Sequence, residues 1–157
     1  MGCFMGGAVM TEILWLSLLA TIGTIGFSVL FHLPAKRLPV VIIGSFVTSL
    51  IQLFCDERMP QLFTGAMLAT MFAVWFSEVF ARVLRTPAIV LLTPILIPLV
   101  PGGSLFYTMQ GILLSNAEQI RQYAMETAQV GFGIAFGTLT ATAVARFFTE
   151  TLFFKRK

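Results

Sequence analysis

The chain has 157 residues, of which 57% are hydrophobic and 11% are charged, and its mean hydropathy is +0.92. Soluble domains carry about 25% charged residues, so this chain has too few charges to cover a surface that faces water, and a soluble enzyme or binding domain is excluded. Its net charge of +3 does not indicate nucleic-acid binding, because the basic residues flank hydrophobic runs in small groups and form no stripe with interleaved aromatics.

The continuity of the hydrophobic runs predicts an all-α integral membrane protein. In hydrocarbon, only helices and closed barrels satisfy their own backbone hydrogen bonds. Barrel strands alternate apolar and polar residues over about ten positions, whereas these runs are continuously apolar and about twice as long. We therefore expect one transmembrane domain, residues 1–157, built as a bundle of about five helices. The expected spans are 13–31, 39–55, 62–81, 88–101 and 130–148.

The first span is expected to stay in the membrane and not to be cleaved as a signal peptide. No basic residue precedes Lys36, and Glu12 stands directly before the apolar run. Small residues inside this span indicate a face for helix packing. They are Gly23, Thr24 and Ser28.

The third span contains Glu78, four residues before Arg82, so a helix places the two side chains on one face. Two interpretations are open. A carboxylate inside a membrane is costly and indicates a proton or ion relay. A position near the cytoplasmic end of the span instead allows an interfacial ion pair with no role in transport.

The fourth span is the shortest and is interrupted by prolines, which remove backbone donors. Broken helices of this kind form solute sites in secondary transporters, where half-helix ends point their dipoles at the solute. The alternative is a kinked packing helix followed by a Pro-Gly-Gly turn. The candidate residues of the solute path are Thr86, Pro87, Thr93, Pro94, Pro98, Pro101, Gly102, Gly103, Tyr107 and Glu78.

Residues 104–129 are mixed in character, with apolar side chains at helical spacing followed by a polar stretch. We expect an amphipathic segment on the outer face of the membrane.

The fifth span carries small residues at four-residue intervals along one face, which permits close approach of another helix, either within the subunit or from a partner. They are Gly133, Gly137, Ala141 and Ala145. Thr138 and Thr142 lie beside them and are expected to add hydrogen bonds between helices.

The distribution of basic residues predicts the topology. With five spans, eight of the ten Lys and Arg residues fall on one side, which the positive-inside rule makes cytoplasmic. The N-terminus is then outside and the C-terminus inside. The eight residues are Lys36, Arg37, Arg82, Arg85, Arg146, Lys155, Arg156 and Lys157, and the other two are Arg58 and Arg121.

Little in the sequence favours catalysis, so we expect no enzyme, no cofactor and no metal. Cys3 and Cys55 show neither a CxxC spacing nor a histidine partner, and His32 is the only histidine. No Asp falls in an expected span, and no glycine group carries the GK[ST] ending of a phosphate loop.

The run RTPAIVLLTPILIPLVPGG at residues 85–103, followed by Leu105-Phe-Tyr107-Thr-Met109, resembles the signature of the threonine/serine exporter family. The segment from Gly23 to Phe27 and Pro34 before the basic pair add to the likeness. The likeness covers most of the chain. It is strongest when the chain is compared with the short, separately encoded subunit of two-component members.

This resemblance implies export of small polar solutes across a bacterial inner membrane, namely threonine and serine or dicarboxylates such as succinate. It also implies a larger membrane subunit as partner, beside the lipid bilayer and a possible second copy of the chain, and an energy source other than nucleotide hydrolysis. The competing hypotheses are a membrane scaffold or assembly subunit that docks through its small-residue face, and a membrane enzyme acting on lipid, for which Glu78 is the only plausible start.

Overall fold

The computed structural model describes the backbone of residues 3–58 and 61–154 and the side chains of residues 11–57 and 61–145. Helices account for all the regular structure in these ranges. In chain order they are α1 (Cys3–Leu30), α2 (Leu38–Arg58), α3 (Leu62–Leu84), α4 (Ala88–Leu96), the 3-10 helix η1 (Ile97–Leu99), α5 (Gly102–Leu113) and α6 (Ala117–Phe154). The expected all-α class is confirmed.

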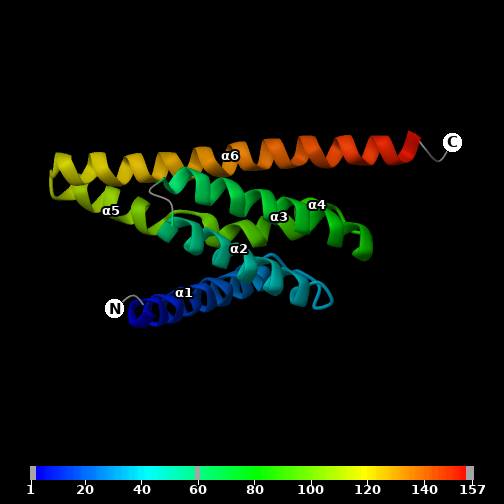
Figure 1. Ribbon diagram of the computed structural model, residues 1–157, viewed down its shortest axis with the longest axis horizontal. Helices are drawn as coiled ribbons and strands as arrows, with labels where there is room; N and C mark the ends of the chain where they lie inside the picture. Colours follow the sequence, from blue (N-terminus) through cyan, green and yellow to red (C-terminus); the bar gives the residue numbers. More distant parts are fainter. Residues whose placement is uncertain (1–2, 59–60, 155–157) are drawn as a thin grey trace.

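The helices run back and forth along the long axis of the molecule (Figure 1). Four of them, α1, α2, α3 and α6, are long and apolar enough to cross a membrane. Taken together, α4, η1 and α5 are also long and apolar enough to cross a membrane, but the segment is bent by 52°. Counted as one broken span it makes five crossings, and the chain is a multi-pass membrane protein.

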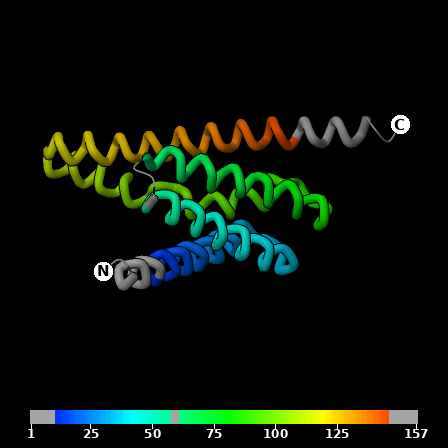
Figure 2. The backbone as a smooth tube through the Cα atoms, viewed as in Figure 1, coloured from blue at the N-terminus to red at the C-terminus, as the bar shows by residue number. Residues whose placement is uncertain are grey.

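The helix of the expected fifth span, α6, begins earlier than the sequence predicts, at Ala117 and not at Val130. The expected outer-face segment 104–129 is therefore divided between α5 and the first turns of α6, which lie side by side as a hairpin (Figure 2). Asn116 caps α6, since its Oδ1 accepts from the backbone N–H of Gln119 at 3.3 Å. With 38 residues, α6 is about 57 Å long and exceeds the roughly 30 Å of a hydrocarbon core.

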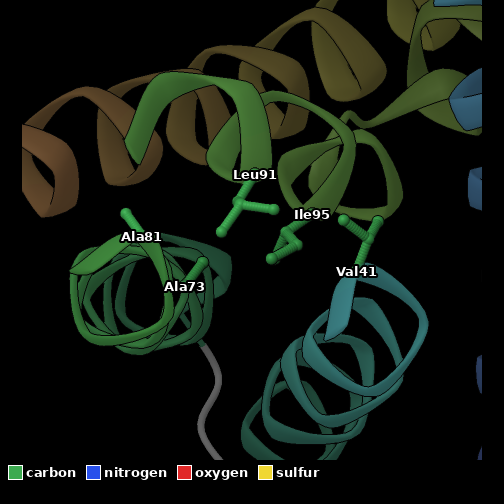
Figure 3. Close-up of a cluster of buried hydrophobic side chains, with 5 residues drawn as sticks. All are labelled: Val41, Ala73, Ala81, Leu91 and Ile95. Carbon is green, nitrogen blue, oxygen red and sulfur yellow. The ribbon is translucent and has the colours of Figure 1, made fainter. Parts of the chain in front are cut away.

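A cluster of buried apolar side chains packs α4 against α2 and α3. Val41 of α2, Ala73 and Ala81 of α3, and Leu91 and Ile95 of α4 are buried together (Figure 3). Because short residues on α3 meet longer ones on α4, the two helices approach closely. The first half of the broken span is thus held by packing between α2 and α3.

Three helices end with a non-glycine residue in the left-handed region. His32, Arg85 and Ser115 have φ values of 53°, 50° and 51°. Each is followed by a backbone N–H that bonds five residues back, as in the bond from Asn116 N to Gly111 O at 2.9 Å. Glycine is the usual residue at this place, and a residue with a Cβ is strained there by about 1 kcal/mol or more.

Replacing Ser115 with glycine is therefore expected to stabilise the chain by up to about 1 kcal/mol, because relief of the left-handed strain exceeds the extra entropy of an unfolded glycine. Thermal unfolding in detergent measures the change. Ser115→Ala keeps the Cβ and serves as the control. An unchanged or lowered midpoint for the glycine variant would show that the turn carries no strain.

Candidate functional site

The break in the fourth span is built by prolines at three levels. Pro94 lies inside α4, where it supplies no N–H for the carbonyl of Val90, and Pro98 lies in η1. Pro101, with φ −76° and ψ 64°, is the centre of an inverse γ-turn in which Gly102 N donates to Val100 O at 2.7 Å. The helix is thus tightened at η1 and redirected at Pro101.

The two glycines after this turn do not form a turn of their own. Gly102 and Gly103 make up the first turn of α5, are exposed and have no positive φ. A Cβ at either position would meet nothing within 4 Å. The Pro-Gly-Gly turn of the alternative interpretation is therefore centred on Pro101, and the two glycines continue directly as helix.

Hydroxyl side chains are buried on the packed faces of the first two helices, and we call this set of residues the hydroxyl seam. Beyond Ile13, every fully buried position on the described part of α1 is a Ser or Thr. α1 packs against α2 and also contacts α4 and η1, so its buried face lies against α2 and beside the broken span. The seam residues are Ser17, Thr21, Thr24 and Ser28 of α1 and Ser45, Thr48 and Ser49 of α2.

Most seam hydroxyls bond to their own helix. Thr24 Oγ1 donates to Ala20 O at 3.1 Å, and Thr48 Oγ1 donates to Gly44 O at 2.7 Å. Because each donates within its helix, its oxygen can still accept a hydrogen bond from another group. Ser17 Oγ has no hydrogen-bond partner although it is buried. The seam is therefore polar and buried, and one of its hydroxyl groups, that of Ser17, has no hydrogen-bond partner.

A cavity of about 550 Å³ lies where the α1–α2 turn meets α4. The turn contributes Phe31, His32, Leu33, Pro34 and Arg37, and α4 contributes Ile89, Val90, Thr93 and Pro94. Its size suits a small solute. A second cavity, of about 360 Å³ between α1 and α2, is lined only by Ile13, Leu14, Leu50, Ile51 and Phe54, an apolar lining that offers a polar solute nothing.

The structure gathers only part of the predicted solute path. Of those residues, Thr93 and Pro94 line the polar cavity. Tyr107 lies farther along α5, where it stacks on Tyr123 with 5.0 Å between ring centroids and its carbonyl accepts from Gln119 Nε2 at 3.3 Å. Its described contacts place it in the α5–α6 hairpin.

The segment before α4 holds the remaining candidates. Pro87 is exposed and precedes the first residue of α4. Thr86 is half-buried and its Oγ1 has no hydrogen-bond partner, while its backbone N–H donates to Ala81 O at 2.9 Å. This segment ends α3 and starts the broken span.

Glu78 forms the expected pair with Arg82, with 3.8 Å between Oε2 and Nη2. The two side chains are 36% and 55% exposed. Exposed pairs of this kind contribute about 0–1 kcal/mol. The geometry is that of an ion pair near the end of α3 and does not require a relay.

The small-residue face of α6 lies against α3 of the same chain. A Cβ on Gly133 would come within 2.7 Å of Phe63 O, and one on Gly137 within 2.8 Å of Met67 O. Ala141 and Ala145 are buried on the same face. Thr142 donates to Thr138 O at 2.6 Å, and Thr138 likewise bonds carbonyls of its own helix. The expected hydrogen bonds between helices are wrong.

Two further expectations change because of how the helices pack. Asp56 was placed outside the spans, but α2 continues to Arg58 and carries it in the candidate span Leu38–Glu57. Its Oδ1 is buried without a partner and lies where a side chain on Gly65 of α3 would be. Gly23 points away from the packed face of α1, with nothing within 4 Å of a Cβ.

Some expectations rest on residues outside those described, including the side chains of Cys3, Arg58 and Arg146 and residues 155–157. Among residues 11–57 and 61–145, no three or more His, Cys, Asp or Glu side chains gather as a metal site would require.

A sequence model of the family described as Threonine/Serine exporter, ThrE, matches residues 16–144. The matched range contains the hydroxyl seam, the broken span and both cavity-lining segments. Searches of curated proteins and of solved structures found no match.

Proposed function

Because the chain belongs to the threonine/serine exporter family, we propose that it is a subunit of an exporter of small polar organic solutes. The solutes are threonine- or serine-like amino acids or dicarboxylates such as succinate. A larger membrane subunit completes the exporter. The complex resides in a bacterial inner membrane, with the N-terminus of this chain outside and its C-terminus in the cytoplasm.

The observation that carries this proposal is the hydroxyl seam beside the broken span. A polar solute crossing hydrocarbon needs partners for its own hydrogen bonds. The Ser and Thr oxygens of α1 and α2 and the loosened backbone around Pro98 and Pro101 offer such partners, and both α1 and α2 contact η1. Because Thr24 and Thr48 are fully buried, solute passage requires α1 to separate from α2 and η1.

The charges at the helix ends support the orientation. The α1–α2 turn and the start of α4 line one cavity, so they share an end of the bundle. Lys36, Arg37, Arg82 and Arg85 belong to the segments at this end, which the positive-inside rule assigns to the cytoplasm. An exporter takes up its solute from that side.

The scaffold hypothesis receives less support. It assigned the small-residue face of α6 to docking of another protein. Gly133 and Gly137 instead lie against the backbone of α3 in the same chain. Their close packing accounts for the small residues without a partner.

Efflux of labelled threonine, serine and succinate from vesicles tests the proposal. Vesicles contain this chain with and without the larger subunit. We expect efflux only with both, and Pro98→Ala or Pro101→Ala to lower it several-fold, because a restored N–H lets the helix close its broken bonds. Pro39→Ala is the control, since Pro39 is exposed in the first turn of α2, where no N–H is needed.

Vesicles in which the assembled and correctly oriented complex moves none of the three solutes under an imposed gradient would overturn the export proposal. Efflux by this chain alone would overturn the requirement for a larger subunit. Equal efflux by the proline variants and Pro39→Ala would remove the broken span from the path.

A further inference from the structure

The cavity at the α1–α2 turn combines a solute-sized volume with uncompensated positive charge. Of the residues that line its 550 Å³, Arg37 is cationic, His32 is titratable and none is acidic. Glu78 forms its ion pair with Arg82, and Arg37 takes no part in that pair. A half-buried guanidinium without a carboxylate is ready to bind an anion.

The guanidinium of Arg37 indicates which kind of anion the cavity would bind. A guanidinium presents parallel N–H donors that match the two oxygens of a carboxylate, and such bidentate pairs are stronger than neutral hydrogen bonds. The neighbouring Lys36 is exposed and does not line the cavity. Of the two basic residues of this turn, only Arg37 lines the cavity. A role in topology alone would not require this difference between Arg37 and Lys36.

The other polar groups of the cavity also have capacity left. His32 Nδ1 lies 3.1 Å from Leu30 O, so Nδ1 carries the proton and donates, and Nε2 remains for a ligand. Thr93 Oγ1 donates to Ile89 O at 2.8 Å, so its oxygen remains an acceptor. The guanidinium of Arg37 suits a carboxylate, and the acceptors His32 Nε2 and Thr93 Oγ1 suit the ammonium group of an α-amino acid.

The cavity also borders the broken span and the end of α1. Pro94, fully buried, forms part of its wall and interrupts α4. His32 closes α1 in a left-handed conformation. A ligand held here contacts both the end of α1 and the broken span, the two elements that must separate to open the seam.

We propose that this cavity is the cytoplasmic binding site for the exported solute, with Arg37 holding its carboxylate and with His32 and Thr93 beside its second polar group. The inference rests on the proposed export function and deepens it by naming the recognised group. The ligand class is an α-amino acid, because the two acceptors beside its second polar group suit an ammonium group and not a second carboxylate.

Equilibrium binding of labelled threonine, serine and succinate to the purified full-length chain, alone and with the larger subunit, tests the site. We expect Arg37→Gln to weaken binding roughly ten- to a hundredfold, as expected for loss of a charged hydrogen-bonding partner. Arg37→Lys should retain part of the affinity. Lys36→Gln removes the same charge from the same turn and should bind like the unaltered chain.

The outcomes separate this site from the export proposal and from lipid binding. Equal loss in both glutamine variants, or no binding by the unaltered chain with its larger subunit, would overturn the carboxylate site. So would an Arg37→Gln effect that occurs with phosphatidylglycerol present but not in phosphatidylcholine alone, since the cavity would then hold a lipid phosphate. Selective loss in Arg37→Gln with no efflux from vesicles would support the site and overturn the export function.

Discussion

Replacing Gly137 with alanine is expected to destabilise the folded chain by about 1–3 kcal/mol, the usual effect of overpacking a tight contact. The new Cβ would lie 2.8 Å from Met67 O and 2.9 Å from Thr70 Cβ. A backbone carbonyl cannot swing away as a long side chain does, so α6 must move off α3. Gly133 has the same relation to Phe63 O, at 2.7 Å, and its alanine variant should behave alike.

The same substitution at Gly131 is the matched control. Gly131 lies in the same helix, is exposed and has nothing within 4 Å of a Cβ. Alanine is the better helix former by about 1 kcal/mol, so Gly131→Ala should stabilise the chain while Gly137→Ala destabilises it. Unfolding of the purified chain in mixed detergent reports both. Equal stabilisation by the two substitutions would show that α3 and α6 do not approach this closely.

Replacing Thr24 or Thr48 with valine is expected to lower export roughly tenfold, because each loses one hydrogen-bonding group worth about 1–3 kcal/mol when a buried polar partner is left unpaired. Valine keeps the shape of threonine. Since both hydroxyls bond carbonyls of their own helices, which keep their main-chain partners, stability should change little. The loss should therefore appear in transport and not in the amount of folded protein.

Thr140→Val provides the comparison for this experiment. Thr140 is exposed on α6 and donates to Phe136 O at 2.7 Å, so the substitution removes the same kind of hydrogen bond from an outward face. Efflux rates per assembled complex, measured beside thermal stability, separate the two effects. Normal efflux through both seam variants would mean that the seam serves packing alone.

The number of crossings and the position of the break were predictable from the sequence. Run length marks a span because each backbone polar group must be bonded inside the segment, and proline marks a break because it has no N–H. The boundaries of the helices were less predictable. The end of α2 was placed at Cys55 and the start of the last helix at Val130, where hydrophobicity falls, but helices continue through the polar residues that follow or precede these points.

The candidate site was only partly predictable. Thr93 and Pro94 were identified from the proline pattern, and the cavity includes both. Arg37 was interpreted as a topology residue, and His32 was noted only as a single histidine. Their role in the cavity depends on α4, about fifty residues later, folding back over the turn. Most of the seam was missed, since isolated Ser and Thr residues in an apolar run do not lower its hydropathy enough to stand out.

Composition and run length by themselves determined that this chain crosses a membrane as helices and that one helical segment is broken by prolines. Only the tertiary structure decided which face of each helix is inward. In water the apolar face is buried, so periodicity reveals it. In lipid the outward face is apolar too, and α1 buries its hydroxyls while it exposes Trp15, Leu19 and Ile22. The neighbouring helices, not hydropathy, therefore select the face on which the candidate site lies.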